Sequence, residues 1–169
     1  AAMDDAADLK PDRPILGSSK MQIAGRRIDV HLAPFAATEG DVWLFDPKTR
    51  TVIAGDLVVG PAPFLDTACP EGWRKALGEI AKVKFATLIP GHGDPMSKAE
   101  FLSWKRAFDN LLDCANGKEA KAVCIAGWKR DAAAFIPKGE TRTDGLIGYY
   151  LDSRLRAPED ERTRYCKPQ

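Results

Sequence analysis

The sequence predicts a mixed α/β (α+β) domain in which strands come first and helices last. Residues 20–54 contain short stretches in which polar and apolar residues alternate, a pattern typical of half-buried strands. Apolar residues recur at helical spacing over residues 71–82 and again over 97–112, and a short apolar strand at 86–89 separates these two segments. This order of strands, helix, strand and helices excludes an all-helical or all-β domain.

The first strands are joined by short turns. Residues 20–32 are typical of a β-hairpin that turns at residues 24–25. Residues 42–54 contain two more predicted strands, and the Asp and Pro that open the connection at 46–49 are typical turn residues. The side chains predicted to share the buried face of the hairpin are Ile28, Val30 and Leu32.

Both predicted helices have sequence signals that define them. The helix at 71–82 places three large apolar residues on one face. Ser97 and Glu100 form an S-x-x-E capping box, which predicts that the next helix begins there. The apolar face of the first helix consists of Trp73, Leu77 and Ile80.

Composition excludes two classes of partner. Hydrophobic residues make up 44% and charged residues 29% of the 169 residues, and the net charge is +1, as in an ordinary globular domain. No basic cluster with interleaved aromatic residues is present, so we expect no nucleic-acid partner. The apolar runs are no longer than a strand, so we expect no membrane-spanning helix and no membrane partner.

Four cysteines leave two interpretations open. They lie at positions 69, 114, 124 and 166 without a C-x-x-C pair, so zinc-ribbon spacing is absent. They are either buried thiols in a cytoplasmic protein or two disulfides in an oxidising compartment. Cys114 and Cys124 flank a helix break, where a short bridge could close, and Cys166 would hold the end of the chain. The second interpretation favours a periplasmic or secreted protein, with a cytoplasmic one as the alternative.

Two loops that follow hydrophobic strands carry the residues most suited to chemistry. Asp56 comes directly after one strand and His92 directly after another, and side chains at strand ends project into the crevices where α/β sheets build sites. A carboxylate and an imidazole together suit zinc, iron or manganese. Each residue alone is more often a turn cap or a structural histidine, so the prediction of a metal site depends on the pair. Glycines at 55, 91 and 93 would let the backbone approach the two side chains.

These motifs resemble the second half of the metallo-β-lactamase superfamily, from Pro14 to Leu112. In that family a Gly-Asp pair at a strand end supplies the metal-bridging carboxylate, matched here by Asp56, and a Pro-Gly-His-Gly loop supplies the last histidine, matched by His92. The resemblance implies a zinc-dependent hydrolase of esters, thioesters or amides, and half of a four-layer αββα sandwich. We therefore expect residues 1–117 to form that half domain and residues 118–169 to form a helical extension.

The sequence departs from the family in its metal ligands. The H-x-H-x-D-H motif, which supplies most ligands in the family, is absent from residues 1–169, and the chain has two histidines. A further family histidine is replaced by Ala37, although Thr38, Gly40 and Asp41 keep the pattern around it. His31 is predicted to face solvent. We therefore expect weak zinc binding or none by this chain alone, and no catalytic residue can be assigned.

Three functions remain open at this point. The first is a fragment of a metallo-β-lactamase-like hydrolase, inactive or metal-poor by itself. The alternative is a non-catalytic binding or assembly protein of the same fold, and a flavodiiron-type electron-transfer protein is a third. An unpaired half would expose the inner face of its sheet, so we expect a partner: a missing N-terminal half or a second copy in a homodimer. Residues 1–12 are predicted to form part of an amphipathic helix entered partway, which suggests a trimmed start.

Overall fold

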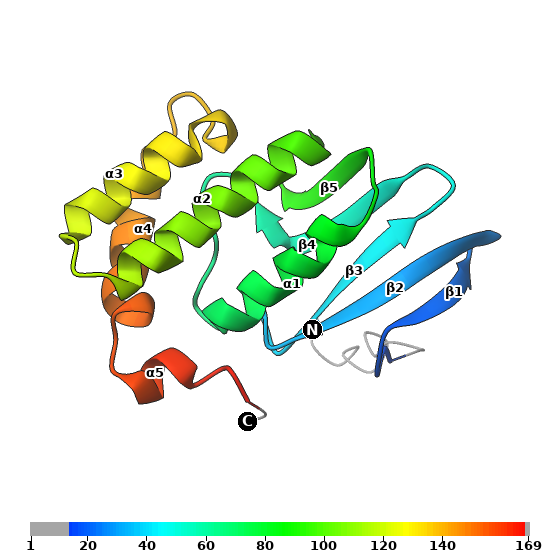
Figure 1. Cartoon of the computed structure of the whole chain (residues 1–169), viewed down its shortest axis with the longest axis horizontal. Helices are drawn as coiled ribbons and strands as arrows, with labels where there is room; N and C mark the ends of the chain where they lie inside the picture. Colours follow the sequence, from blue (N-terminus) through cyan, green and yellow to red (C-terminus); the bar gives the residue numbers. More distant parts are fainter. Residues whose placement is uncertain (1–13, 168–169) are drawn as a thin grey trace, which may run out of the picture.

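A computed structural model describes residues 14–167, and it shows one sheet with helices packed against it (Figure 1). The amphipathic helix predicted for residues 1–12 lies outside the described residues. The six strands follow one another across the sheet in sequence order, and all neighbouring strands are antiparallel except β4 and β5. The strands are β1 Ser19–Ile23, β2 Arg26–Pro34, β3 Gly40–Asp46, β4 Thr51–Val59, β5 Thr87–His92 and β6 Met96–Ser97.

The helices follow the order expected from the sequence. Helix α1 makes the crossover between the parallel strands β4 and β5, and the remaining helices follow β6. The helices are α1 Pro70–Lys82, α2 Lys98–Asn116, α3 Lys121–Asp131, α4 Thr143–Tyr150 and α5 Glu159–Thr163, with a 3₁₀ turn η2 at Ala133–Phe135 and a π-helical turn η3 at Leu151–Leu155. The predicted mixed α/β class is confirmed. No helix within residues 14–167 is long and apolar enough to cross a membrane.

The predicted hairpin is confirmed, with its turn at Ala24 and Gly25. Both residues have positive φ angles, 48° and 74°, as a two-residue type I′ turn requires. Val30 is buried, whereas Ile28 and Leu32 are half-buried, so the predicted buried face is only partly covered.

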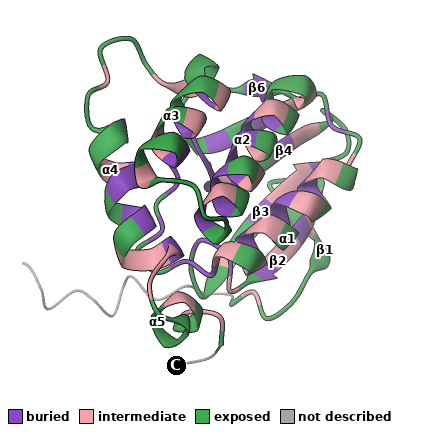
Figure 2. Ribbon diagram, turned by 60° about the vertical axis from the view of Figure 1, so that its left-hand side comes forward, coloured by how far each residue is buried: buried purple, intermediate pink, exposed green. Residues whose placement is uncertain are grey.

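The local signals that predicted α1 and α2 are also confirmed. Trp73, Leu77 and Ile80 are fully buried, and the Trp73 indole donates to the carbonyl of Leu57 in β4 at 2.9 Å. Ser97 caps α2 in a complete capping box with Glu100. Figure 2 shows buried residues concentrated where the helices meet the sheet.

The face of the sheet that the helices leave uncovered carries apolar side chains. Within β4, Val52 and Ala54 are buried, while Ile53 between them is 44% exposed, because successive side chains point to opposite faces. Ile53 pairs with Leu44 on one side and with Ile89, 40% exposed, on the other. This row of apolar residues is what the sequence predicted for a half domain.

The C-terminal helices share the hydrophobic core of the sheet. Trp128, Ile147 and Tyr150 belong to the same buried cluster as Val52 and Leu88. Residue 117 lies between α2 and α3, and the helices on both sides of it contribute to this one continuous core. After Tyr150, the last residue of α4, the backbone widens into the π-helical turn η3.

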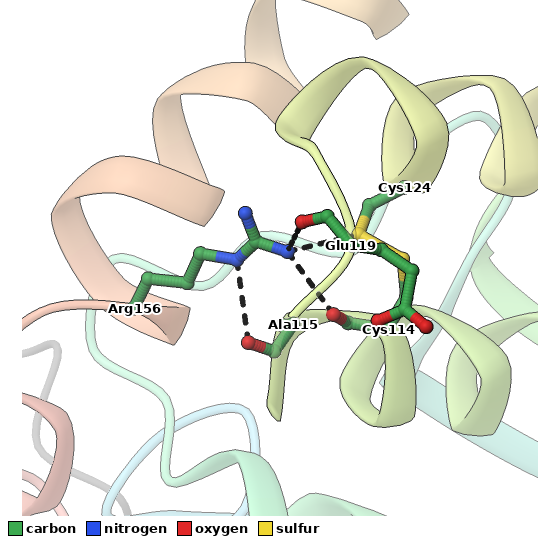
Figure 3. Close-up of a disulfide and its surroundings, with 5 residues drawn as sticks. All are labelled: Cys114, Ala115, Glu119, Cys124 and Arg156. Carbon is green, nitrogen blue, oxygen red and sulfur yellow. Dashed lines mark hydrogen bonds between the residues drawn. A yellow bond between two sulfur atoms is a disulfide. The ribbon is translucent and has the colours of Figure 1, made fainter. Parts of the chain in front are cut away.

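Two disulfides close the fold, Cys69–Cys166 and Cys114–Cys124. Beside the second, the Arg156 guanidinium donates to the carbonyls of Cys114, Ala115 and Glu119 (Figure 3). It thereby supplies a positive charge to the C-terminal end of α2, whose own last turn has no basic residue. Buried free thiols are excluded, and the disulfides indicate an oxidising compartment.

Candidate functional site

The structure brings the two predicted metal ligands together. The parallel pairing of β4 and β5 places Asp56 and His92 beside each other, with His92 Nε2 3.6 Å from Asp56 Oδ1. Two ligand atoms on a tetrahedral zinc ion lie roughly 3.4 Å apart. The pair is therefore spaced as two ligands of one metal would be. Both side chains are more than half exposed, 60% for His92 and 58% for Asp56, so donors from elsewhere could reach them.

Glycine at position 91 is required by the position of Asp56. A β-carbon at Gly91 would lie 2.2 Å from Asp56 Oδ1 and 2.8 Å from the carbonyl carbon of Gly55, closer than atoms can pack. Gly55 itself has a φ of +53° and lies where the register of the β4–β5 pairing shifts. Such an irregularity changes the direction of the side chain that follows, here Asp56. Gly55 and Gly91 therefore let the two strand ends come close to the Asp56 side chain, as the sequence predicted.

The donor set is incomplete for a metal. Within residues 14–167 no three His, Cys, Asp or Glu side chains are grouped as metal ligands would be. Ala37 is buried and supplies no donor. Catalytic zinc sites use three protein ligands, so Asp56 and His92 have suitable donor chemistry but are one ligand short.

His31 does not reach this pair. Its imidazole stacks on the indole of Trp43 with ring centroids 3.8 Å apart and planes 5° from parallel. The prediction that His31 faces solvent is wrong, because this stacking leaves it half-buried. Burial lowers the pKa of His31, while the charge of Asp29 opposes that shift and that of Lys20 adds to it.

Asp41 is a further carboxylate near the site. Its side chain accepts a hydrogen bond from the backbone N–H of Thr38 at 2.8 Å. Burial raises the pKa of Asp41, hydrogen bonds from Thr38 oppose the shift, and the negative charge of Asp56 contributes to it. The sequence pattern around Ala37 pointed to Asp41 but gave it no role.

The loop over residues 60–66 follows β4 and runs beside His92. Its Phe64 is 42% exposed, and its ring meets the His92 imidazole edge-on at a centroid distance of 5.8 Å. The N–H of Gly60 donates to the carbonyl of His92 at 2.8 Å. Sequence reasoning missed that Phe64 forms a wall beside the histidine.

A pocket of about 670 Å³ lies elsewhere, between β2 and α1. Its walls include His31, Trp43 and Lys75, and neither Asp56 nor His92 lines it. Asp56 and His92 instead lie at an open surface, since both side chains are more than half exposed.

Comparisons with known proteins identify the fold. No family model matches the sequence, and no curated protein matches it. Among solved structures, a metallo-β-lactamase from Pontibacter korlensis superposes with a TM-score of 0.50 and 19% identity over 64% of this chain and 54% of its own. TMB-1 superposes with a TM-score of 0.50 and 13% identity over 62% of this chain and 51% of its own. A double mutant of the sec-alkyl sulfatase PisA1 superposes with a TM-score of 0.54 and 15% identity over 92% of this chain and 27% of its own.

The chain spans about half the length of the first two proteins and about a quarter of the third. The resemblance inferred from the Gly-Asp and Pro-Gly-His-Gly motifs is therefore confirmed at the level of the fold. This chain has the fold of part of a metallo-β-lactamase-like domain.

Proposed function

We propose that this chain contributes Asp56 and His92 as metal ligands to a metallo-β-lactamase-type hydrolase site that other residues complete. The observation that carries the proposal is their 3.6 Å approach at the ends of two parallel strands, with Gly91 leaving the space that the carboxylate needs. A structural turn would have no need of this histidine beside the carboxylate.

The metal of choice is zinc, with iron or manganese as alternatives, since all three accept a carboxylate and an imidazole. Zinc bound at such a site would activate a water molecule for attack on an ester, thioester or amide. The residues described here hold two of the three ligands that this chemistry needs, so we assign no catalytic step to them. The chain alone should be metal-poor and inactive.

The missing ligands would come from a partner that covers the open face of the sheet. A segment with an H-x-H-x-D-H motif and its own sheet would pack on the row formed by Leu44, Ile53 and Ile89. The chain spans only about half of two solved relatives, which favours such an N-terminal half over a second copy. A homodimer is the other outcome that a measurement of mass in solution would reveal.

The alternative function is a non-catalytic binding or assembly protein of the same fold. Ala37 favours it, because a buried methyl group stands where the family pattern has a histidine. The two functions make opposite predictions for metal binding by Asp56.

Metal content decides between them. We would purify the protein without chelator, titrate it with zinc to saturation, and measure the metal bound in equilibrium with free zinc in the wild type and in Asp56→Ala. The hydrolase proposal predicts zinc that Asp56→Ala loses, with weak affinity in this chain alone. Less than about a tenth of an equivalent in the wild type would favour the non-catalytic protein.

We also propose a periplasmic or secreted location, which the two disulfides support. Counting free thiols in protein isolated from its native compartment tests it. Four reactive thiols after unfolding would contradict this location.

A further inference from the structure

The loop over residues 60–66 is attached to the candidate site at its first residue. Gly60 donates its N–H to the carbonyl of His92, and Val59 pairs with His92 in the β4–β5 ladder. Farther along the loop, Phe64 sets its ring edge-on to the His92 imidazole. The path of this loop therefore determines what lies next to His92.

The helices beyond residue 97 hold this loop by side-chain hydrogen bonds along its length. The indole of Trp104 donates to the carbonyl of Gly60 at 3.4 Å and to that of Val59, at the end of β4, at 3.1 Å. The indole of Trp128 donates to the carbonyl of Pro61 at 2.9 Å. Arg154, in the turn η3, donates to the carbonyl of Leu65 at 3.2 Å. A loop without regular structure is thus fixed by elements that come later in the chain.

Tyr150 makes the one contact to a loop side chain among these four. Its hydroxyl donates to Oδ2 of Asp66 at 2.5 Å, and its ring is 1% exposed. Burial, followed by the bond to Asp66, raises the pKa of Tyr150, so the hydroxyl keeps its proton and remains a donor. Hydrogen bonds to an ionised acceptor are among the stronger ones in proteins.

Asp66 is itself exposed, so water can replace the tyrosine hydroxyl. Removing that hydroxyl therefore leaves no buried charge without a partner, and its main effect is to loosen the loop at Asp66 while Trp104, Trp128 and Arg154 keep their bonds to it. Loss of the Tyr150 hydroxyl therefore tests whether this residue positions the loop, without the cost in stability that an unpaired buried charge would bring.

We propose that Tyr150 is a positioning residue for the candidate site: by holding Asp66 it fixes loop 60–66 and thereby sets Phe64 against His92. Phe64 then forms an apolar wall beside His92. The inference rests on the proposed function for its chemical meaning, but its geometry can be tested without metal.

The test compares Tyr150→Phe with Tyr149→Phe by NMR. Tyr149 is the adjacent residue of the same type and is 55% exposed, so the second variant is a matched control. The chain has two histidines, so the His92 imidazole signals are readily assigned with His92→Gln. Phe64→Leu gives the chemical shifts of the His92 imidazole that are expected when the Phe64 ring is absent.

We expect the His92 signals of Tyr150→Phe to move towards those of Phe64→Leu, and exchange of the Gly60 amide to become about tenfold faster. Asp66→Ala removes the same hydrogen bond from an exposed position and should give the same changes. Tyr149→Phe should match the wild type. His92 signals and Gly60 exchange that stay at wild-type values in both Tyr150→Phe and Asp66→Ala would overturn the inference.

Zinc titration of the same proteins separates this inference from the proposed function. If the wild type binds zinc, Tyr150→Phe should weaken binding about tenfold and Tyr149→Phe should not. A wild type that binds no zinc contradicts the proposed function, while the His92 shifts and the Gly60 exchange still decide whether Tyr150 positions the loop.

Discussion

The carboxylate of Asp56 occupies the space that a β-carbon at Gly91 would need. The distance from that β-carbon to Asp56 Oδ1 would be 2.2 Å, and the backbone of Gly55 would be 2.8 Å away. Because the second contact is with backbone, a side chain at position 91 cannot be accommodated by rotating Asp56. The two strand ends are therefore built to let this carboxylate approach His92.

Gly91→Ala should displace Asp56 and destabilise the protein by about 1–3 kcal/mol, the usual cost of overpacking. Urea unfolding measures the loss. Gly78→Ala is the control, since Gly78 lies inside α1 with open space around it; there alanine should stabilise the helix by about 1 kcal/mol. Equal effects of the two substitutions would contradict the geometry at position 91.

His31 should make stability fall as the solution becomes acidic. Its pKa is lowered from 6.5 by burial against Trp43, so the folded protein favours the neutral ring. This contribution is fully present above pH 6.5 and is lost as the pH falls through the lowered pKa. His31→Phe, which keeps a flat ring on Trp43, should lose this part of the pH dependence in urea unfolding. An NMR titration that gives His31 a pKa of 6.5 or higher would contradict the account.

The two disulfides should differ in their effect on stability. Cys69–Cys166 closes a loop of 97 residues and Cys114–Cys124 one of 10. In the chain-entropy treatment, removing the first should cost about 5 kcal/mol and removing the second about 3. Urea unfolding of the two double alanine variants tests the order. A larger loss for the Cys114–Cys124 variant would show that its local contacts, including Arg156, outweigh loop entropy.

The open face of the sheet should bind a hydrophobic dye or a second copy of the chain. Ile53 and Ile89 are the exposed members of its apolar row. Ile53→Ser combined with Ile89→Ser should reduce dye fluorescence and any dimer seen by light scattering. Val123→Ser is the control, because Val123 is 55% exposed on α3, away from the sheet. A wild type that is a clean monomer and binds no dye would argue against the proposed partner.

Local sequence signals predicted most of the fold because they act within a few residues. The turn at Ala24-Gly25, the capping box of Ser97 and the buried face of α1 each depend on near neighbours. The π-helical turn after Tyr150 could not be predicted. It accompanies the distant contacts of Arg154 with Leu65 and of Arg156 with the end of α2, and such contacts leave no periodic pattern.

At the candidate site, the sequence predicted Asp56 and His92 but not their surroundings. The motifs placed both residues at strand ends, and strand pairing then determined their approach. The wall formed by Phe64 and the bond between Tyr150 and Asp66 join residues up to 84 positions apart, so no local pattern indicated them. The partner of His31 was missed because Trp43 faces it from the neighbouring strand.

The most direct test of the account is a zinc titration followed through the imidazole signals of the two histidines. If Asp56 and His92 form a metal site, zinc should shift or broaden the His92 signals saturably and leave those of His31 unchanged, and Asp56→Ala should abolish the effect. Zinc that leaves His92 unaffected, or that perturbs His31 and His92 alike in both proteins, would contradict the central claim.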